Sequence, residues 1–493
     1  MQLERPLKID EVKSRAVTGI RAFGMRTIVS LVLRVISSIC LAHLLFPVDY
    51  GQFGVAAYVT GLALYFSDVG LGGALVRQVI EPKDDEQTTV FIGQQVITGT
   101  VVALLVIGSP WITRAYNLPH SSEGLIVVMA LGIFFNSLRV VPIIALEREL
   151  RFAAIARCEL VENIVQTVST IVFALLGTGA WCFAIGGLLR GAVGLSMVWA
   201  ASPWRPRGRF RWDILVRLAK YGIAFQLNAI APTLLAGWMP WVVSRTLGVA
   251  TLGLVNWAIN LSSVPMMLSA VLNRVAFPTL SRIQSDDAAM GETVLAAVRR
   301  LNALLWVTVP VIVLIAPLVI PMIFPAKWSP AIPFVQWFSL ETGLLTVNGL
   351  LSAAQNATGY AGDRLAVAVG SGLFRFALGY TCITLFGIHA LGPTAAISAA
   401  VELLATTILL KHRARVPTIN VPAVFEPIVA YCAGLGGAWL IAFVLIKGEL
   451  LLQTIMALVI FIAFVTVREV LAPRRVLASE LRGLLAMLGT VTR

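Results

Sequence analysis

Apolar runs of membrane-spanning length recur from one end of this 493-residue chain to the other. A helix of about twenty apolar residues crosses the hydrocarbon core of a bilayer. Apolar residues make up 58% of the chain and charged residues only 13%, whereas soluble proteins average roughly 45–50% and about 25%. So few charges could not cover so much apolar surface in water, and the sequence therefore predicts an all-α polytopic membrane protein.

Breaks at proline, glycine and charged clusters divide the chain into about fourteen predicted transmembrane helices. Their approximate limits are 27–46, 51–75, 88–110, 124–144, 153–177, 180–201, 219–245, 250–273, 301–323, 334–354, 365–386, 394–410, 424–446 and 450–468. We group them into an amphipathic lead-in at the membrane surface (1–26), a first six-helix lobe (27–201), a basic cytoplasmic linker (202–218), a second six-helix lobe (219–412), and two extra C-terminal helices with a basic tail (413–493).

The distribution of lysine and arginine tests this division, because cytoplasmic loops are enriched in basic residues. Of the 38 basic residues, 30 fall at the two termini and in the alternate loops that would lie on the same side. Four lie in the opposite loops and four within predicted helices: Arg114, Arg245, Lys327 and Lys447, and Arg34, Arg139, Arg190 and Arg375. The imbalance predicts that both termini are cytoplasmic. It also explains the net charge of +13 by membrane orientation and by attraction to anionic lipid headgroups, rather than by nucleic-acid binding.

A weak internal repeat appears when the chain is shifted by 202 residues. "LFPVDYGQFGVA" (45–56) then lies over "LGVATLGLVNWA" (247–258), which pairs Gly51 with Gly253. Both segments join the first and second helices of a six-helix set, so the two lobes would be pseudo-symmetric parallel repeats. Transporters that work by alternating access are commonly built in this way. The alternative is that the duplication is fortuitous and the chain is a membrane-embedded enzyme.

Four arginines within predicted helices need an explanation, because a charge at the bilayer centre costs about 2.5–3.5 kcal/mol on insertion scales. At a rise of 1.5 Å per residue, Arg139 would lie about 8 Å from the inner end of its helix, which predicts that it snorkels to the surface. Arg34 would lie about 12 Å deep, Arg375 about 15 Å and Arg190 about 16 Å, and the last two are beyond easy snorkelling.

Embedded acidic residues occur at comparable depths. Asp68 is close in depth to Arg34, Glu162 matches Arg190, and Arg375 lies between Glu341 and Glu402 in the sequence. Two interpretations remain open. Either these are ion pairs that fasten helices together, or the four arginines line a cationic, water-filled cavity that binds an anion, with the acids carrying the H⁺ or Na⁺ that drives transport.

Motifs of other function classes are absent from the sequence. It contains no G-x-x-x-x-G-K-[ST], and its loops hold no catalytic Ser/His/Asp set, HExxH or paired catalytic carboxylates. The four histidines are scattered and the five cysteines show no CxxC spacing. We therefore expect no enzymatic activity, no metal site and no cofactor.

Several motifs resemble those of the bacterial polysaccharide and oligosaccharide flippases, within the multidrug/oligosaccharidyl-lipid/polysaccharide exporter superfamily. The family pattern L-L-x-P-x-D-[FY]-G is similar to residues 44–51, and S-D-x-G-L-G-x-A-L-[VI] is similar to residues 67–76. "ERELRFAAIA" (147–156) and "GTGAWCFAIGGLL" (177–189) resemble the family's inner loop and its turn between the fifth and sixth helices.

The resemblance implies a transporter that flips polyprenyl-diphosphate-linked oligosaccharide across the bacterial inner membrane for exopolysaccharide, capsule or O-antigen assembly. Implied partners are this substrate, membrane lipids, and a polymerase or other assembly proteins. Alternatives are a drug/proton or drug/sodium antiporter of the same superfamily, or a membrane glycosyltransferase or ligase. Many relatives carry an acid in the seventh helix, whereas residues 234–248 hold none, and Trp238 and Trp241 lie there instead.

Overall fold

The computed structural model describes residues 9–68, 70–76, 82–263, 266, 287–357, 361–412, 419, 421–445 and 448–471. Within these ranges the regular elements are helices and no strand occurs. Nine of the described helical segments are long and apolar enough to cross a membrane, and the shorter α11 is also apolar. The chain is thus an all-α polytopic membrane protein, as the hydropathy pattern predicts.

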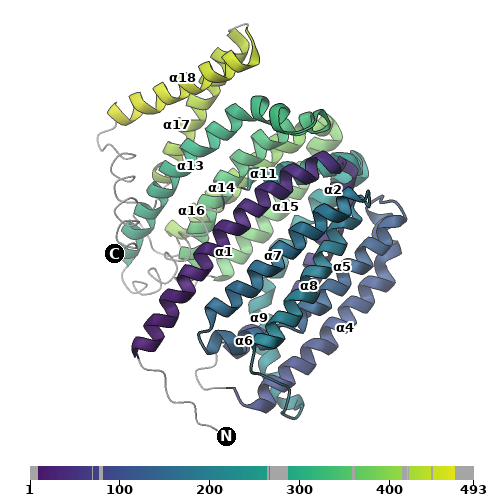
Figure 1. Ribbon diagram of the computed structural model, residues 1–493. Coiled ribbons are helices and arrows are strands. Elements are labelled where there is room, and N and C mark those ends of the chain that lie inside the picture. Colours follow the sequence, from purple (N-terminus) through teal and green to yellow (C-terminus); the bar gives the residue numbers. More distant parts are fainter. Residues whose placement is uncertain are drawn as a thin grey trace. The chain divides into compact units, whose positions relative to one another are not determined.

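The chain divides into two compact units, Met1–Gly253 and Leu254–Arg493. The first unit contains α1 (Ile9–Leu44), α2 (Pro47–Asp68), α3 (Leu71–Val76), α4 (Asp84–Ala115), α5 (Ser121–Ser137), α6 (Val140–Arg148), α7 (Phe152–Leu175), α8 (Trp181–Ala201), α9 (Trp212–Ala236), α10 (Trp238–Thr246) and the start of α11 (Val249–Ser262). Within it, α7 packs against both α1 and α8 (Figure 1).

The second unit contains α13 (Asp287–Ile323), α14 (Ile332–Ala357), α15 (Ala361–Phe386), α16 (Leu391–His412), α17 (Val421–Trp439) and α18 (Leu450–Leu471), with short 3₁₀ or π segments at Ala326–Ala331, Gly387–Ala390 and Leu440–Leu445. Here α14 packs against α13 and α16, and α17 and α18 pack against α13 (Figure 1). Its core contains Trp306 and Tyr431, both fully buried among aliphatic side chains.

Most predicted helices match observed ones to within a few residues, but three of them are broken in two. The second becomes α2 and α3 around Gly70, which has a φ of 72°. The fourth becomes α5 and α6 with the break at Leu138 and Arg139, and the seventh becomes α9 and α10 at Gly237. From Ile9 on, the predicted lead-in continues without interruption into the first transmembrane helix as the 36-residue α1, and residues 1–8 lie outside the described chain.

The two segments matched by the internal repeat contact each other within the first unit. A Cβ atom built on Gly51 would overlap the carbonyl oxygen of Val249, and one built on Gly253 would overlap the carbonyl oxygen of Pro47. Pro47 and Val249 are themselves paired by the 202-residue shift. The shift therefore turns the contact of Gly51 with Val249 into the contact of Gly253 with Pro47. Such reciprocal contacts are typical of twofold symmetry. It supports the repeat, although the predicted lobe boundary near residue 219 stays a prediction.

This close approach leads to a test of packing on α2. We expect Gly51→Ala to lower the melting temperature of the detergent-solubilised protein, because the added methyl group forces two backbones apart at a cost of about 1–3 kcal/mol. Gly61→Ala on the same helix is the control, since a Cβ there meets nothing within 4 Å. It should leave stability unchanged or raise it. Equal losses from both substitutions, in a fluorescence-monitored melt, would show that the Gly51 contact is not tight.

Candidate functional site

The first unit buries a charged cluster of two arginines and one glutamate. Arg139 Nη2 lies 2.5 Å from Glu162 Oε1, and Arg139 Nη1 donates to Glu162 Oε2 at 3.1 Å. Arg190 Nε lies 3.6 Å from the same Glu162 Oε2, and its Nη1 donates to Gln166 Oε1 at 3.0 Å. The Glu162 side chain is 1% exposed, Arg139 10% and Arg190 42%. Arg139 is therefore enclosed in a bidentate ion pair, whereas Arg190 is held loosely and is open on one side.

Three local features of the sequence assemble this cluster. The break between α5 and α6 places Arg139 directly before the first residue of α6. Glu162 and Gln166 lie four residues apart on one face of α7. On α8, Gly194 follows Arg190 by one turn, and a Cβ built on it would lie 2.5 Å from Glu162 Oε1 and 2.7 Å from Arg139 Nη1. The absence of a side chain at residue 194 leaves the space that the ion pair occupies.

The prediction that Arg139 snorkels is wrong. Residues 121–148 still form one span of membrane-crossing length, but the guanidinium is buried against α7 and paired there with Glu162. A buried guanidinium without a partner would be a desolvated charge, which is costly. The carboxylate of Glu162 therefore makes its shorter contact with Arg139. The expected contact between Glu162 and Arg190 is present, but it is longer than the contact between Glu162 and Arg139.

The second unit buries a cluster with the opposite balance of charge. Arg375 on α15 donates from Nη1 to Glu341 Oε1 on α14 at 2.6 Å. Its Nη2 lies 4.0 Å from Glu402 Oε2 on α16. Asn348 Nδ2 on α14 donates to Glu402 Oε1 at 2.8 Å, while Asn348 Oδ1 is buried without a partner among the described residues. One guanidinium is thus shared by the two carboxylates that flank it in the sequence.

Formal charges differ between the clusters. Arg139, Arg190 and Glu162 sum to one positive charge, and Arg375, Glu341 and Glu402 sum to one negative charge. Each unit therefore holds one charge that its own cluster does not neutralise. A buried excess charge is costly in a membrane, so an anion at the first cluster, or a cation at the second, would be bound favourably.

Arg34 does not join the cluster of the first unit. The side chain of Arg34 is exposed on α1, and neighbouring residues hold that helix in place. Arg26 pairs with Glu159 at 3.1 Å, and Asn163 donates to Ser30 at 2.9 Å. Asp68 ends α2, but its side chain lies outside the described residues, so the expected pairing with Arg34 stays a prediction.

The aromatic residues of the seventh predicted helix serve mainly in packing. Trp238 is buried at the start of α10. The ring of Trp241 faces Arg245, whose guanidinium carbon lies 5.6 Å from the ring centroid.

Comparison with known proteins places the chain in a family. Residues 40–333 match the polysaccharide biosynthesis protein family. The chain belongs to this family.

Curated relatives of this family member include two transport or biosynthesis proteins. It is 26% identical over 318 residues to the succinoglycan biosynthesis transport protein ExoT of Rhizobium meliloti, a match that covers 62% of each chain. It is 23% identical over 360 residues to the lipopolysaccharide biosynthesis protein WzxC of Escherichia coli, which covers 71% of this chain and 70% of WzxC. The chain thus spans somewhat less than two thirds of ExoT.

Solved structures show the same fold. The lipid II flippase MurJ, in an inward closed conformation, superposes with a TM-score of 0.72 over 90% of this chain and 98% of MurJ, at 14% identity. An inward-facing multidrug resistance transporter of the MATE family superposes with a TM-score of 0.62 over 80% of this chain and 98% of that one, also at 14% identity. The polysaccharide family protein therefore has the helical fold of these transporters.

Sequence reasoning missed three residues of the clusters: Gln166, Gly194 and Asn348. Gln166 follows Glu162 by four residues, and Gly194 follows Arg190 by four, so helical periodicity alone would have placed both beside charged groups. Asn348 follows Glu341 by seven residues, two turns along the same face of α14. A search along each helix from its embedded charge would have identified all three.

The role of Gly194 leads to a second test. Gly194→Ala should lower the melting temperature of the family protein, because the methyl group displaces Glu162 from Arg139, and opening a buried ion pair costs about 3–5 kcal/mol. Gly187→Ala on the same helix is the matched control, since a Cβ there has open space around it. If the two variants melt at the same temperature, the ion pair does not depend on the space at residue 194.

Proposed function

We propose that this protein flips oligosaccharide linked to a polyprenyl diphosphate across the bacterial inner membrane, for polysaccharide assembly. The single observation that carries the proposal is membership of the polysaccharide biosynthesis family in a chain with the fold of a lipid-linked substrate flippase. The names of ExoT and WzxC support the same substrate class. The proposal needs no catalytic step, because only transfer between leaflets is required, and it favours the flippase over the drug antiporter.

Orientation follows from the basic residues. The side that collects 30 of the 38 lysines and arginines is proposed to be cytoplasmic, with both termini there. Substrate would enter from that leaflet and leave from the other by alternating access between the two repeats. A polysaccharide polymerase or other assembly protein would then receive it.

Arg190 is the proposed contact for the diphosphate. It is the more exposed arginine of the first cluster, and its 3.6 Å approach to Glu162 is longer than a good charge-assisted hydrogen bond. Its planar guanidinium can bind two phosphate oxygens while Gln166 still accepts from one nitrogen. Arg139 remains paired with Glu162 and holds that carboxylate in place, which makes Arg139 a positioning residue. Arg34 is proposed to add positive potential along the path. Arg375, which was expected to bind the anion, lies in a cluster with a net negative charge and is proposed instead to act as the counter-charge of Glu341 and Glu402.

The second cluster is the proposed site of ion coupling. Glu341 takes the short contact with Arg375, and Glu402 keeps a longer one together with the amide of Asn348. A proton on Glu402, or a Na⁺ ion between Glu402 and the unpartnered Asn348 Oδ1, would neutralise the excess negative charge. Asp68 and Glu162 remain further candidates for coupling.

Export by arginine variants tests the anion contact. We expect Arg190→Gln to reduce polysaccharide export by about tenfold or more, since a charge-assisted hydrogen bond is worth about 1.5–3 kcal/mol. Arg157→Gln is the control, because Arg157 is exposed near the start of α7 and bonds only to a backbone carbonyl among the described residues. Export would be measured as secreted polysaccharide per amount of membrane-inserted protein. Full export by Arg190→Gln would contradict the proposed contact.

Arg375 requires a conservative comparison, because its loss leaves two carboxylates facing each other. Arg375→Gln should lower both export and the amount of folded protein, whereas Arg375→Lys should restore folding by keeping the charge. If the lysine variant folds and exports normally, Arg375 acts only as a counter-charge for Glu341 and Glu402. If it folds but exports poorly, the forked geometry of the guanidinium contributes to transport.

Coupling is tested with proteoliposomes that carry a labelled polyprenyl-diphosphate oligosaccharide. Glu402→Gln should make the initial flipping rate insensitive to an imposed pH or Na⁺ gradient, because the amide neither binds a proton at neutral pH nor carries the charge that attracts Na⁺. Glu292→Gln, at an exposed position of α13, is the control and should keep the gradient response of the unsubstituted protein. Gradient dependence that survives in Glu402→Gln would place the coupling elsewhere.

A further inference from the structure

The segment between α8 and α9 is a non-helical strap, residues 202–211, fixed along the start of α4. Three backbone N–H groups of the strap donate to side chains in the first turns of α4. Gly208 donates to Thr88 Oγ1 at 3.0 Å, Arg209 to Asp85 Oδ1 at 2.8 Å, and Arg211 to Thr89 Oγ1 at 3.0 Å. A Cβ on Gly208 would overlap the backbone of Asp84. The strap is therefore held flat against α4 by its main chain.

Two side chains in the first half of the strap are engaged by the protein itself. Trp204 is buried, and its ring lies 5.3 Å from that of Phe91. The guanidinium of Arg205 donates to the carbonyl oxygens of Ser202, Trp204 and Trp199 at 2.7–3.1 Å. Arg205 thus satisfies carbonyl groups at the end of α8 and is not available for a ligand.

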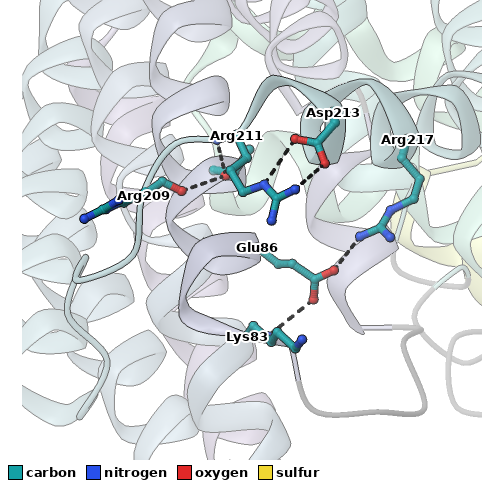
Figure 2. A network of polar contacts seen from close by, with 7 residues as sticks. Lys83, Glu86, Arg209, Arg211, Asp213 and Arg217 are labelled. Carbon is teal, nitrogen blue, oxygen red and sulfur yellow. Dashed lines mark hydrogen bonds and ion pairs between the residues drawn. The ribbon is translucent and has the colours of Figure 1, made fainter.

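Two of the remaining arginines are neutralised by carboxylates beside the strap. Arg211 makes two bonds to Asp213, at 2.9 and 3.2 Å, and Arg217 pairs with Glu86 of α4 (Figure 2). The guanidinium of Arg211 lowers the pKa of Asp213 below its usual value. Neither arginine contributes much free charge.

The second half of the strap and the first residue of α9 carry exposed arginine and aromatic side chains. The side chains of Arg207 and Arg209 are exposed and contact no carboxylate among the described residues. In Figure 2 the side chain of Arg209 points away from the ion-pair network. Beside them, Phe210 is exposed and Trp212 is 67% exposed, with ring centroids 6.2 Å apart. Two uncommitted guanidinium groups therefore adjoin two exposed aromatic rings.

The strap lies at the level where membrane helices begin and end. It follows the predicted span Trp181–Ala201, precedes α9, and lies against the first residues of the span Asp84–Ala115. Aromatic rings are stable at this depth because they reach the acyl chains while the polar parts stay near headgroups. Arginines at the same level face lipid phosphates, and guanidinium groups bind phosphate oxygens in pairs.

We propose that this strap is a binding site for an anionic phospholipid, with Arg207 and Arg209 on the headgroup phosphate and Phe210 and Trp212 inserted at the interface. The site is separate from both buried clusters. It stabilises the junction of α4, α8 and α9 by attaching their common surface to the leaflet. Single-stranded nucleic acid also prefers basic and aromatic surfaces, but the position of the rings at the ends of membrane helices favours lipid.

Lipid titration of the purified full chain in detergent tests this site. Native mass spectrometry would compare retention of dioleoyl phosphatidylglycerol with that of dioleoyl phosphatidylcholine. The double variant R207Q/R209Q should lower the apparent affinity for phosphatidylglycerol about tenfold or more, at roughly fivefold per arginine near a membrane surface, and leave phosphatidylcholine unaffected. The control R114Q/R245Q removes the same charge from two exposed arginines elsewhere and should change neither lipid. The variant F210S/W212S should weaken both lipids.

Three results would overturn the proposal. Equal loss of phosphatidylglycerol in R207Q/R209Q and R114Q/R245Q would assign the effect to net charge. Displacement of the lipid by millimolar inorganic phosphate would indicate a simple anion site. Binding of a single-stranded oligonucleotide more tightly than phosphatidylglycerol, with the same dependence on Arg207 and Arg209, would identify a different partner.

Discussion

A guanidinium group inside a bilayer has to find its counter-charge within the protein, and this requirement organises both units. In the first unit, Arg139 beside α6, Glu162 on α7 and Arg190 on α8 satisfy one another only if three helical segments keep a fixed register. In the second, Glu341, Arg375 and Glu402 impose the same condition on α14, α15 and α16. Because loss of one member leaves an uncompensated buried charge, these triads specify helix packing more strictly than apolar contacts do.

The two triads carry formal charges of opposite sign, and the proposed function assigns each surplus charge a different ligand. A pair that only fastened helices would be stablest with equal numbers of each charge. Here the first triad has a surplus guanidinium that is partly open, and the second has a surplus carboxylate beside an amide oxygen that lacks a partner in the described chain. Substrate anion and coupling cation would therefore be neutralised in different units. The transport cycle would then link two sites of opposite charge rather than one shared site.

Hydropathy and charge were sufficient to predict the helical class and most helix limits, because each helix must match the bilayer whatever its neighbours are. The order of residues also placed Arg375 between its two glutamates. The break at Leu138 and Arg139 was missed, although the sequence contains its cause. Pro142 has no N–H to donate to the carbonyl of Leu138 four residues before it, and Trp199 Nε1 donates to that carbonyl instead. The preference of Glu162 for Arg139 depends on the space left at Gly194, which is a packing property and not a pattern in one segment.

Neutral amides occupy a particular place in both triads, and they bear on how such clusters can operate in a transporter. Gln166 accepts from Arg190 in the first, and Asn348 donates to Glu402 in the second. An amide holds its charged neighbour in position through a hydrogen bond without neutralising it. The charged group keeps its orientation while its charge remains available to a ligand. A carboxylate or guanidinium in place of either amide would complete the ion pair and raise the free energy needed to release it. Under the proposed function, the amides would combine a fixed geometry with a charge that a ligand can neutralise.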